Sequence, residues 1–232
     1  MKKYEFTENT IMFSGHTLYR IRALIDIPEY NVKAGDFGGW IENNTNLSNN
    51  GLCWVSKYAW VFGDARVYDD AYVTDNAKVF GSASVSDKSR VCNNAVVKDN
   101  AKVYGNALVS DNAVIKNSAQ VSSNAIISGN ATISLFADIT DNAEVSGHAK
   151  VSGNAMVMER ASIFDHAYVT DDAVVNGTCR IYGHSWIYDR AEIGGTAQIC
   201  GHAHVRGNVK INGNTHINRH IILEGSQTIH ND

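Results

Sequence analysis

The sequence repeats every six residues over most of its length. Every sixth position from Val55 to Ile229 is valine or isoleucine, with Leu223 as the exception. Four residues after each of these aliphatics comes a second regular position, which is alanine in most repeats between Ala59 and Ala203. β-Branched side chains suit a pleated, buried surface. A period of six excludes an array of amphipathic α-helices, whose apolar residues recur about every 3.6 positions.

Polar dipeptides lie between the two apolar positions. Asp75-Asn76, Gly105-Asn106 and Asp141-Asn142 are examples, and these residue types tolerate positive φ and fit tight turns. Each hexad therefore predicts one short strand and one corner. Three hexads close a triangular coil of eighteen residues, and stacked coils lie about 4.8 Å apart. The sequence predicts an all-β, single-stranded parallel β-helix of about ten such coils around a Val/Ile axis.

Two stretches resemble known families. The hexad Val103-Tyr104-Gly105-Asn106-Ala107-Leu108 resembles the hexapeptide repeat of left-handed β-helix proteins, many of which are acyltransferases. This resemblance implies a left-handed crossover, against the usual right-handed rule for parallel connections. Residues 18–66, with the segment Gly35-Asp36-Phe37-Gly38-Gly39-Trp40, resemble YdcK-type proteins of enteric bacteria and phages, whose transferase label rests on the fold.

The N-terminal residues 1–40 lack the regular repeat and predict a β cap. Thr10 to Phe13 and Leu18 to Leu24 flank a Ser14-Gly15-His16 turn, as in a β-hairpin. The period of six starts weakly with Ile41 and Leu47. We therefore expect an N-terminal hairpin cap at 1–40 and one continuous left-handed β-helix at 41–232.

Composition narrows the classes of function. The net charge of −4 and the lack of long like-charged runs argue against a nucleic-acid partner. No apolar run has the length of a membrane span, and the N-terminus lacks the apolar stretch of a signal peptide, so we expect no membrane partner and a cytoplasmic location. The cysteines are far apart and predict reduced thiols: Cys53, Cys92, Cys179 and Cys200.

The most specific polar pattern is a column of histidines eighteen residues apart: His148, His166, His184, His202 and His220. Asparagines occupy the same column earlier in the chain. The column could bind metal ions or an anion, or change charge near about pH 6.5. Alternatively, histidine replaces asparagine at a left-handed backbone position of the corner. Aromatic residues also align at eighteen-residue intervals, Tyr168 with Trp186 and Phe164 with Tyr182. We group Tyr168, Tyr182 and Trp186 with the histidines as candidate ligand-binding residues.

Outward-facing aliphatic residues predict an oligomer interface. Val96 and Val114 align on one face, and Leu108 and Ile126 on the next. Related β-helices associate through such faces, which favours a homo-oligomer, with a trimer first. The alternative is that these aliphatic residues pack only against one another, between neighbouring strands of their own sheet.

The uninterrupted repeat bears on function, because hexapeptide acyltransferases usually place their catalytic histidine near a long loop. No such insertion follows Val55, and Cys200 with His202 is weak evidence for a nucleophile and base. We therefore predict a non-catalytic binding or scaffold protein that presents flat faces and a His/aromatic edge to a protein partner or small ligand, without a cofactor, an assigned metal or a catalytic residue. The alternative is a hexapeptide-type acyltransferase that binds acyl-CoA between subunits.

Overall fold

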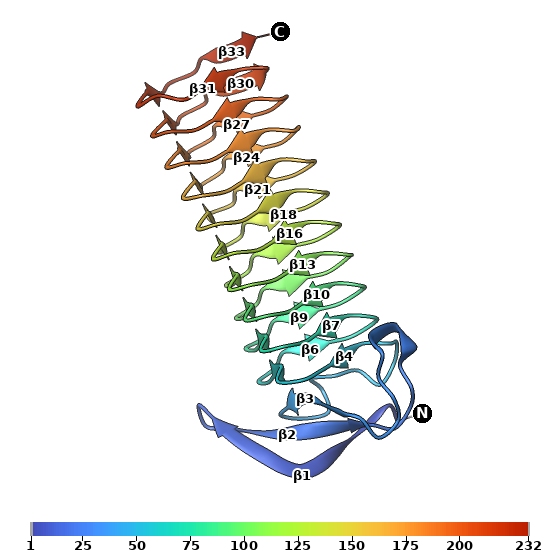
Figure 1. Cartoon of the computed structure of the whole chain (residues 1–232). Helices are drawn as coiled ribbons and strands as arrows, with labels where there is room; N and C mark the ends of the chain where they lie inside the picture. Colours follow the sequence, from blue (N-terminus) through green and yellow to red (C-terminus); the bar gives the residue numbers. More distant parts are fainter. Residues whose placement is uncertain (1, 232) are drawn as a thin grey trace.

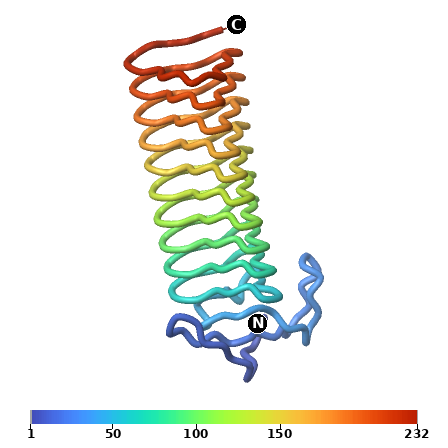
Figure 2. Tube along the Cα trace, turned by 60° about the vertical axis from the view of Figure 1, so that its left-hand side comes forward, coloured from blue at the N-terminus to red at the C-terminus, as the bar shows by residue number. Residues whose placement is uncertain are grey.

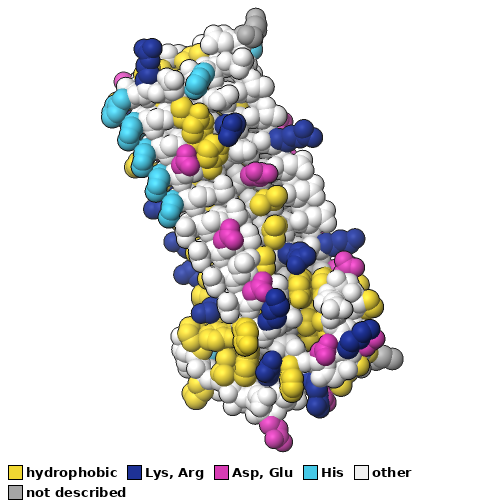
Figure 3. Space-filling view, viewed as in Figure 1, with side chains coloured by type: hydrophobic (Ala, Val, Ile, Leu, Met, Phe, Trp, Pro, Cys, Tyr) yellow, Lys and Arg dark blue, Asp and Glu magenta, His cyan; other side chains and the backbone are white. Residues whose placement is uncertain are grey.

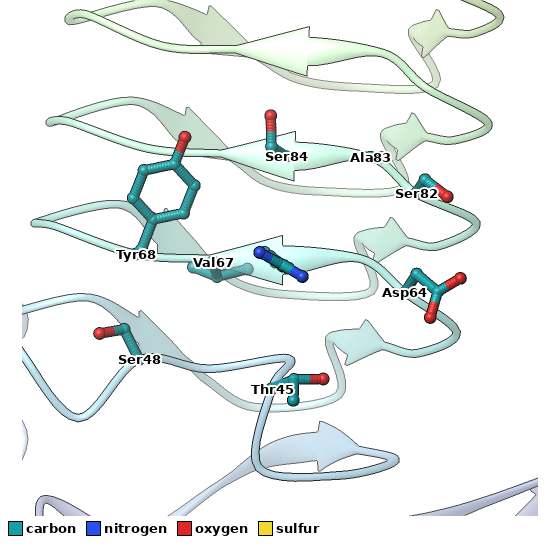
Figure 4. A pocket seen from close by; sticks show the side chains of 9 residues that line it. Thr45, Ser48, Asp64, Val67, Tyr68, Ser82, Ala83 and Ser84 are labelled. Atoms are coloured by element: carbon teal, nitrogen blue, oxygen red, sulfur yellow. The ribbon is translucent and has the colours of Figure 1, made fainter.

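The computed structural model describes residues 2–231 and shows an all-β solenoid of about eleven triangular turns. Figure 1 shows the coils stacked into a prism whose N-terminal end is crossed by β1 (Tyr4–Phe13) and β2 (His16–Ala23). The Cα trace in Figure 2 places the C-terminus at the opposite end of the stack. In Figure 4 the near strand runs leftward from Asp64 to Tyr68 while the chain climbs toward its C-terminus. The coils are therefore left-handed, as the resemblance implied.

Three sheets form the faces of the prism, and all their strands in the coils are parallel. The A face, which also includes β1 and β2, contains β3 (Phe37–Ile41), β5 (Trp60–Val61), β8 (Lys78–Val79), β11 (Val96–Val97), β14 (Val114–Ile115), β17 (Thr132–Ile133), β20 (Lys150–Val151), β23 (Tyr168–Val169), β26 (Trp186–Ile187), β29 (His204–Val205) and β32 (Ile222–Leu223). The B face contains β4 (Trp54–Val55), β7 (Tyr72–Val73), β10 (Arg90–Val91), β13 (Leu108–Val109), β16 (Ile126–Ile127), β19 (Glu144–Val145), β22 (Ser162–Ile163), β25 (Arg180–Ile181), β28 (Gln198–Ile199) and β31 (His216–Ile217). The C face contains β6 (Arg66–Val67), β9 (Ser84–Val85), β12 (Lys102–Val103), β15 (Gln120–Val121), β18 (Asp138–Ile139), β21 (Met156–Val157), β24 (Val174–Val175), β27 (Glu192–Ile193), β30 (Lys210–Gly213) and β33 (Thr228–Asn231).

Residues eighteen positions apart are neighbours in every sheet. Val96 pairs with Val114, and Lys150 pairs with Tyr168. The backbone N–H of Lys150 donates to the carbonyl of Ala167, with an N to O distance of 2.9 Å. This pattern, from each donor to a carbonyl seventeen residues further on, recurs along the solenoid and satisfies the backbone of otherwise very short strands. The expected register is confirmed.

The core is the predicted column of aliphatic side chains. The Val/Ile position is buried from Val55 to Ile211, and the alanine position beside it is buried from Ala59 to Ala203. Toward the C-terminus the column becomes half-exposed at Ile217, Leu223 and Ile229, because β31, β32 and β33 are the last strands of their sheets.

The corners explain the polar dipeptides. Every sixth residue from Lys57 to Gly213 has positive φ, and the residue after it does not. At Gly153 the corners approach so closely that an added Cβ would lie 2.5 Å from the backbone nitrogen of Asp171. Where the residue with positive φ is an aspartate, its carboxylate usually accepts a hydrogen bond from the backbone of the next coil. Asp165 Oδ2 accepts one from the Gly183 N–H at 3.2 Å, and Asp189 Oδ2 accepts one from the Gly207 N–H at 2.9 Å. These carboxylates therefore have a structural role.

The N-terminal hairpin is confirmed as a cap. Ser14 and Gly15 both have positive φ and form the turn between β1 and β2. β2 pairs antiparallel with β3, which in turn pairs parallel with β5, so the expected boundary at residue 40 falls inside a strand shared by cap and solenoid. The buried Tyr4 hydroxyl donates to the Leu47 carbonyl at 2.9 Å. A short 3-10 helix, η1 (Pro28–Tyr30), precedes β3.

Candidate functional site

One corner of the prism carries asparagine in its N-terminal half and histidine in its C-terminal half. We call it the Asn/His edge, and it consists of Asn76, Asn94, Asn112, Asn130, His148, His166, His184, His202 and His220. The edge joins the B face to the A face, because each residue follows a B-face strand and precedes an A-face strand. Figure 3 shows histidine side chains in a row along one edge of the upper half of the molecule.

The five histidines stack one per coil, as the eighteen-residue spacing predicted. Ring centroids are 4.9 Å apart between His148 and His166 and between His166 and His184, and 5.0 Å apart between His184 and His202. These three pairs are parallel to within 4°. His202 and His220 are 5.5 Å apart and inclined by 29°. All five side chains are exposed.

The backbone does not require histidine at these positions. At four of the five corners the residue with positive φ is the one just before the histidine: Gly147, Asp165, Gly183 and Gly201. The interpretation that histidine replaces asparagine at a left-handed backbone position is therefore wrong. The hexad pattern located the corner dipeptide, but it did not show which of its two residues adopts positive φ.

The two halves of the edge differ in how their polar atoms are used. The Asn76 amide donates to the Asn94 carbonyl oxygen at 3.3 Å, and the Asn94 amide donates to Asn112 at 3.2 Å. These asparagines form a ladder that partly satisfies itself. Within residues 2–231, the ring nitrogens of the edge histidines have no hydrogen-bond or ion-pair partner. They are free to bind solvent or a ligand.

The predicted aromatic residues lie on both sides of the Asn/His edge. Tyr168 and Trp186 lie on the A face beside the histidines, with ring centroids 5.2 Å apart in an edge-to-face contact. Tyr182 lies on the B face, where it stacks on Phe164 at 4.9 Å. Trp186 also stacks on His204 at 5.6 Å, and its side chain is 45% exposed. The stacked pairs, Tyr182 on Phe164 and Trp186 on His204, cover one another's faces, whereas Tyr168 and Trp186 do not.

A hollow of about 340 Å³ separates the first two edge histidines from the A-face aromatics. It is lined by His148, Lys150, His166, Ala167, Tyr168 and Trp186. The volume is at the small end of the range for ligand sites, about 300–1,000 Å³. Sequence reasoning missed Lys150. The available signal was position, because the residue two places after each edge histidine faces outward on the A face.

The histidine column does not form a metal site as it stands. A zinc–nitrogen bond of about 2.1 Å brings two ligands within about 4.2 Å of each other, which is less than the spacing of these parallel rings. No three His, Cys, Asp or Glu side chains in the described part of the chain are placed to hold a metal ion.

The cysteines are all free thiols, as expected. Burial raises the pKa of the Cys179 thiol to about 11 and also raises the pKa of the Cys53 thiol, so both stay protonated at neutral pH. Cys200 is nearly buried, and its sulfur lies 3.8 Å from His216 Nε2 in the next coil. Proximity in sequence had instead suggested His202.

The predicted interface residues align as expected. Val96 pairs with Val114 on the A face, and Leu108 pairs with Ile126 on the B face, so both pairs flank the asparagine half of the edge. Ile126 is 38% exposed, whereas the other three are half-buried. A homo-oligomer through these faces stays a prediction, for which light scattering is the measurement.

A second hollow, of about 700 Å³, lies on the C face near the cap. Figure 4 shows Tyr68, Asp64, Thr45 and Ser48 around it, at successive levels of the stack. The remaining lining includes Arg66 and small side chains, and it contains neither imidazole nor thiol. We therefore place the candidate site at the histidine half of the edge.

Comparison with known families agrees with the fold. No helix within residues 2–231 has the length and apolar character needed to cross a membrane. None of the curated proteins matches this sequence. A family model described as the YdcK β-solenoid repeat matches residues 101–117, in the middle of the solenoid rather than in the N-terminal stretch of closest resemblance. The chain is thus a β-solenoid protein that carries the YdcK β-solenoid repeat.

Proposed function

We propose that this chain is a binding protein whose ligand contacts the histidine half of the Asn/His edge and the adjoining A-face hollow. The observation that carries the proposal is the row of exposed ring nitrogens without protein partners, repeated on five successive coils. A requirement for positive φ does not account for the row, since none of the five histidines has positive φ.

The chemistry of the row suits a polar ligand. A neutral imidazole offers one N–H donor and one nitrogen acceptor, and a protonated one offers two donors. Lys150 adds a cationic group at the hollow, and Trp186 adds a partly exposed aromatic edge. The Tyr168 hydroxyl is already paired with Ser152 Oγ at 3.0 Å, which fixes that ring. The donors are held by a hydrogen-bonded frame, so little conformational entropy is lost on binding.

Acyl transfer at a site between subunits remains the alternative prediction. Corner residues keep the six-residue register from Lys57 to Gly213, so no loop projects from the coils over that range. The structure therefore offers no specific support for a pocket of the acyl-CoA type.

The variant His166→Asn/His184→Asn/His202→Asn tests the proposal, because asparagine already occupies this column in earlier coils. We expect its free energy of unfolding in urea to stay within about 1 kcal/mol of wild type, since amide hydrogen bonds replace ring stacking. Thermal-shift measurements with acetyl-CoA, ATP, Zn²⁺, and neutral and acidic oligosaccharides should find a compound that raises the melting temperature of wild type but not of the variant.

Two results would count against a binding role. A large loss of stability in the variant would show that the histidines hold the coils together. Equal stabilisation of both proteins by every active compound would place binding elsewhere, and acetyl-CoA acting in this way would favour the acyltransferase alternative.

A further inference from the structure

We infer that the ligand of the histidine row is a linear acidic polysaccharide. It lies on the outside of the edge, parallel to the solenoid axis, with successive sugars facing successive coils. This inference rests on the proposed function and specifies its ligand.

The first argument is the length of the row. The hollow itself involves only His148 and His166, whereas the same exposed donor recurs at His184, His202 and His220. The steps between rings are 4.9 to 5.5 Å. A compact ligand in the hollow cannot reach the last three histidines. An extended chain of 1,4-linked pyranose sugars advances by a similar distance per sugar, so each sugar can meet one imidazole.

The second argument concerns the ring faces. Bases of single-stranded nucleic acids bind by stacking on exposed aromatic faces. Along the row, neighbouring imidazoles cover one another's faces. Beside the row, Trp186 stacks on His204 and meets Tyr168 edge to face. Neutral polysaccharides also favour stacking on open aromatic faces. Ring edges with N–H donors instead suit the carboxylates and hydroxyls of an acidic sugar.

The third argument is the charge beside the row. Lys150 lies on the A face at the hollow, Arg180 lies on the B face over the rings of Phe164 and Tyr182, and Arg219 precedes His220. These are cations. The acids are Asp165, whose carboxylate accepts the Gly183 N–H, and Glu144, which lies on the B face four residues before His148. The other titratable neighbours are Tyr182, Cys200 and His216 on the B face and Tyr168 and His204 on the A face.

Protonation changes what the row offers a ligand. A neutral imidazole has one N–H donor, whereas a protonated one has two donors and a positive charge that pairs with a carboxylate. Parallel cations at this spacing repel one another unless such counter-charges lie along the row. Binding should therefore strengthen as the pH falls.

The test is isothermal titration of the full chain with oligogalacturonates from dimer to hexamer at about pH 5.5 and about pH 7.5. We expect affinity to rise with length until the row is filled, at about five sugars, and to fall at least about tenfold between the two pH values. The His166→Asn/His184→Asn/His202→Asn variant should bind at least about tenfold more weakly and lose the pH dependence. Asn94→Ala/Asn112→Ala, in the other half of the edge, should bind as wild type does.

Other outcomes separate this inference from the proposed function. No binding of oligogalacturonate at either pH, or equally tight binding of neutral cello-oligosaccharides of the same length, overturns the inference but leaves the thermal-shift test of the edge to decide the function. Tighter binding of a single-stranded oligonucleotide, lost in the triple variant, also overturns the inference while supporting the site. Equal binding of oligogalacturonate by wild type and triple variant contradicts both.

Discussion

Replacing Ile133 with aspartate should leave the chain largely unfolded at room temperature. Ile133 lies in β17 with its side chain completely buried in the axial column. The substitution removes the buried aliphatic group, which costs about 2–5 kcal/mol, and places an unpaired carboxyl group in a dry core at several kcal/mol more. A domain is stable by only about 5–15 kcal/mol. Circular dichroism and urea unfolding measure the loss.

The neighbouring residue supplies the matched control. Thr132 is on the outward side of the same strand, between Val114 and Lys150 of the adjacent coils. Aspartate at position 132 should change the free energy of unfolding by no more than about 1 kcal/mol, since it remains hydrated and faces a lysine. Similar losses in the two variants would mean that the alternation of inward and outward side chains is wrong.

Removing one complete coil should give a protein that still folds, whereas removing slightly less should not. Deletion of residues 103–120 places Val121 directly after Lys102, and in the native structure Val121 stacks on Val103. Every column downstream keeps its register. Because the stability of a solenoid is roughly additive over its repeats, we expect a reduction of about a tenth in the free energy of unfolding.

Deletion of residues 103–117 is the counterpart. It places Ser118 at the core position of Val103 and leaves the stretch between two successive corners three residues too long. We expect a broad or split thermal transition, an enlarged hydrodynamic radius and strong loss of the native circular dichroism signal. If the two deletions melted alike, coils of eighteen residues would not be the structural unit.

The fold was readable from the sequence because each layer of the structure has its own residue type at a fixed spacing. Valine and isoleucine mark the buried axial column, alanine marks the position where the walls approach closely beside each corner, and the polar dipeptides mark the corners themselves. The columns follow from the period alone. That is why the stacking of His148 on His166 and the pairing of Val96 with Val114 were predictable.

The details of the candidate site were less accessible. Which corner residue takes positive φ depends on how three strands close a coil, and that assignment was wrong for the histidines. Relations between different columns depend on side-chain direction as well as on period. Examples are the contact of Cys200 with His216 and the shared hollow lined by His148 and Lys150. The use of ring edges rather than ring faces likewise emerged only from the interplanar angles.

The central claim is that each turn of the chain takes eighteen residues, and its backbone hydrogen bonds can be observed directly. Through-hydrogen-bond scalar couplings in a triple-labelled sample join an amide nitrogen to the carbonyl carbon that accepts its proton. The structure predicts couplings from Val114 to Ala131, from Lys150 to Ala167 and from Tyr168 to Ser185, always seventeen residues forward. Corner amides such as that of Ala113 instead bond to a carbonyl three residues back, here that of Ser110. Couplings from those three strand amides to any separation other than seventeen would contradict the account.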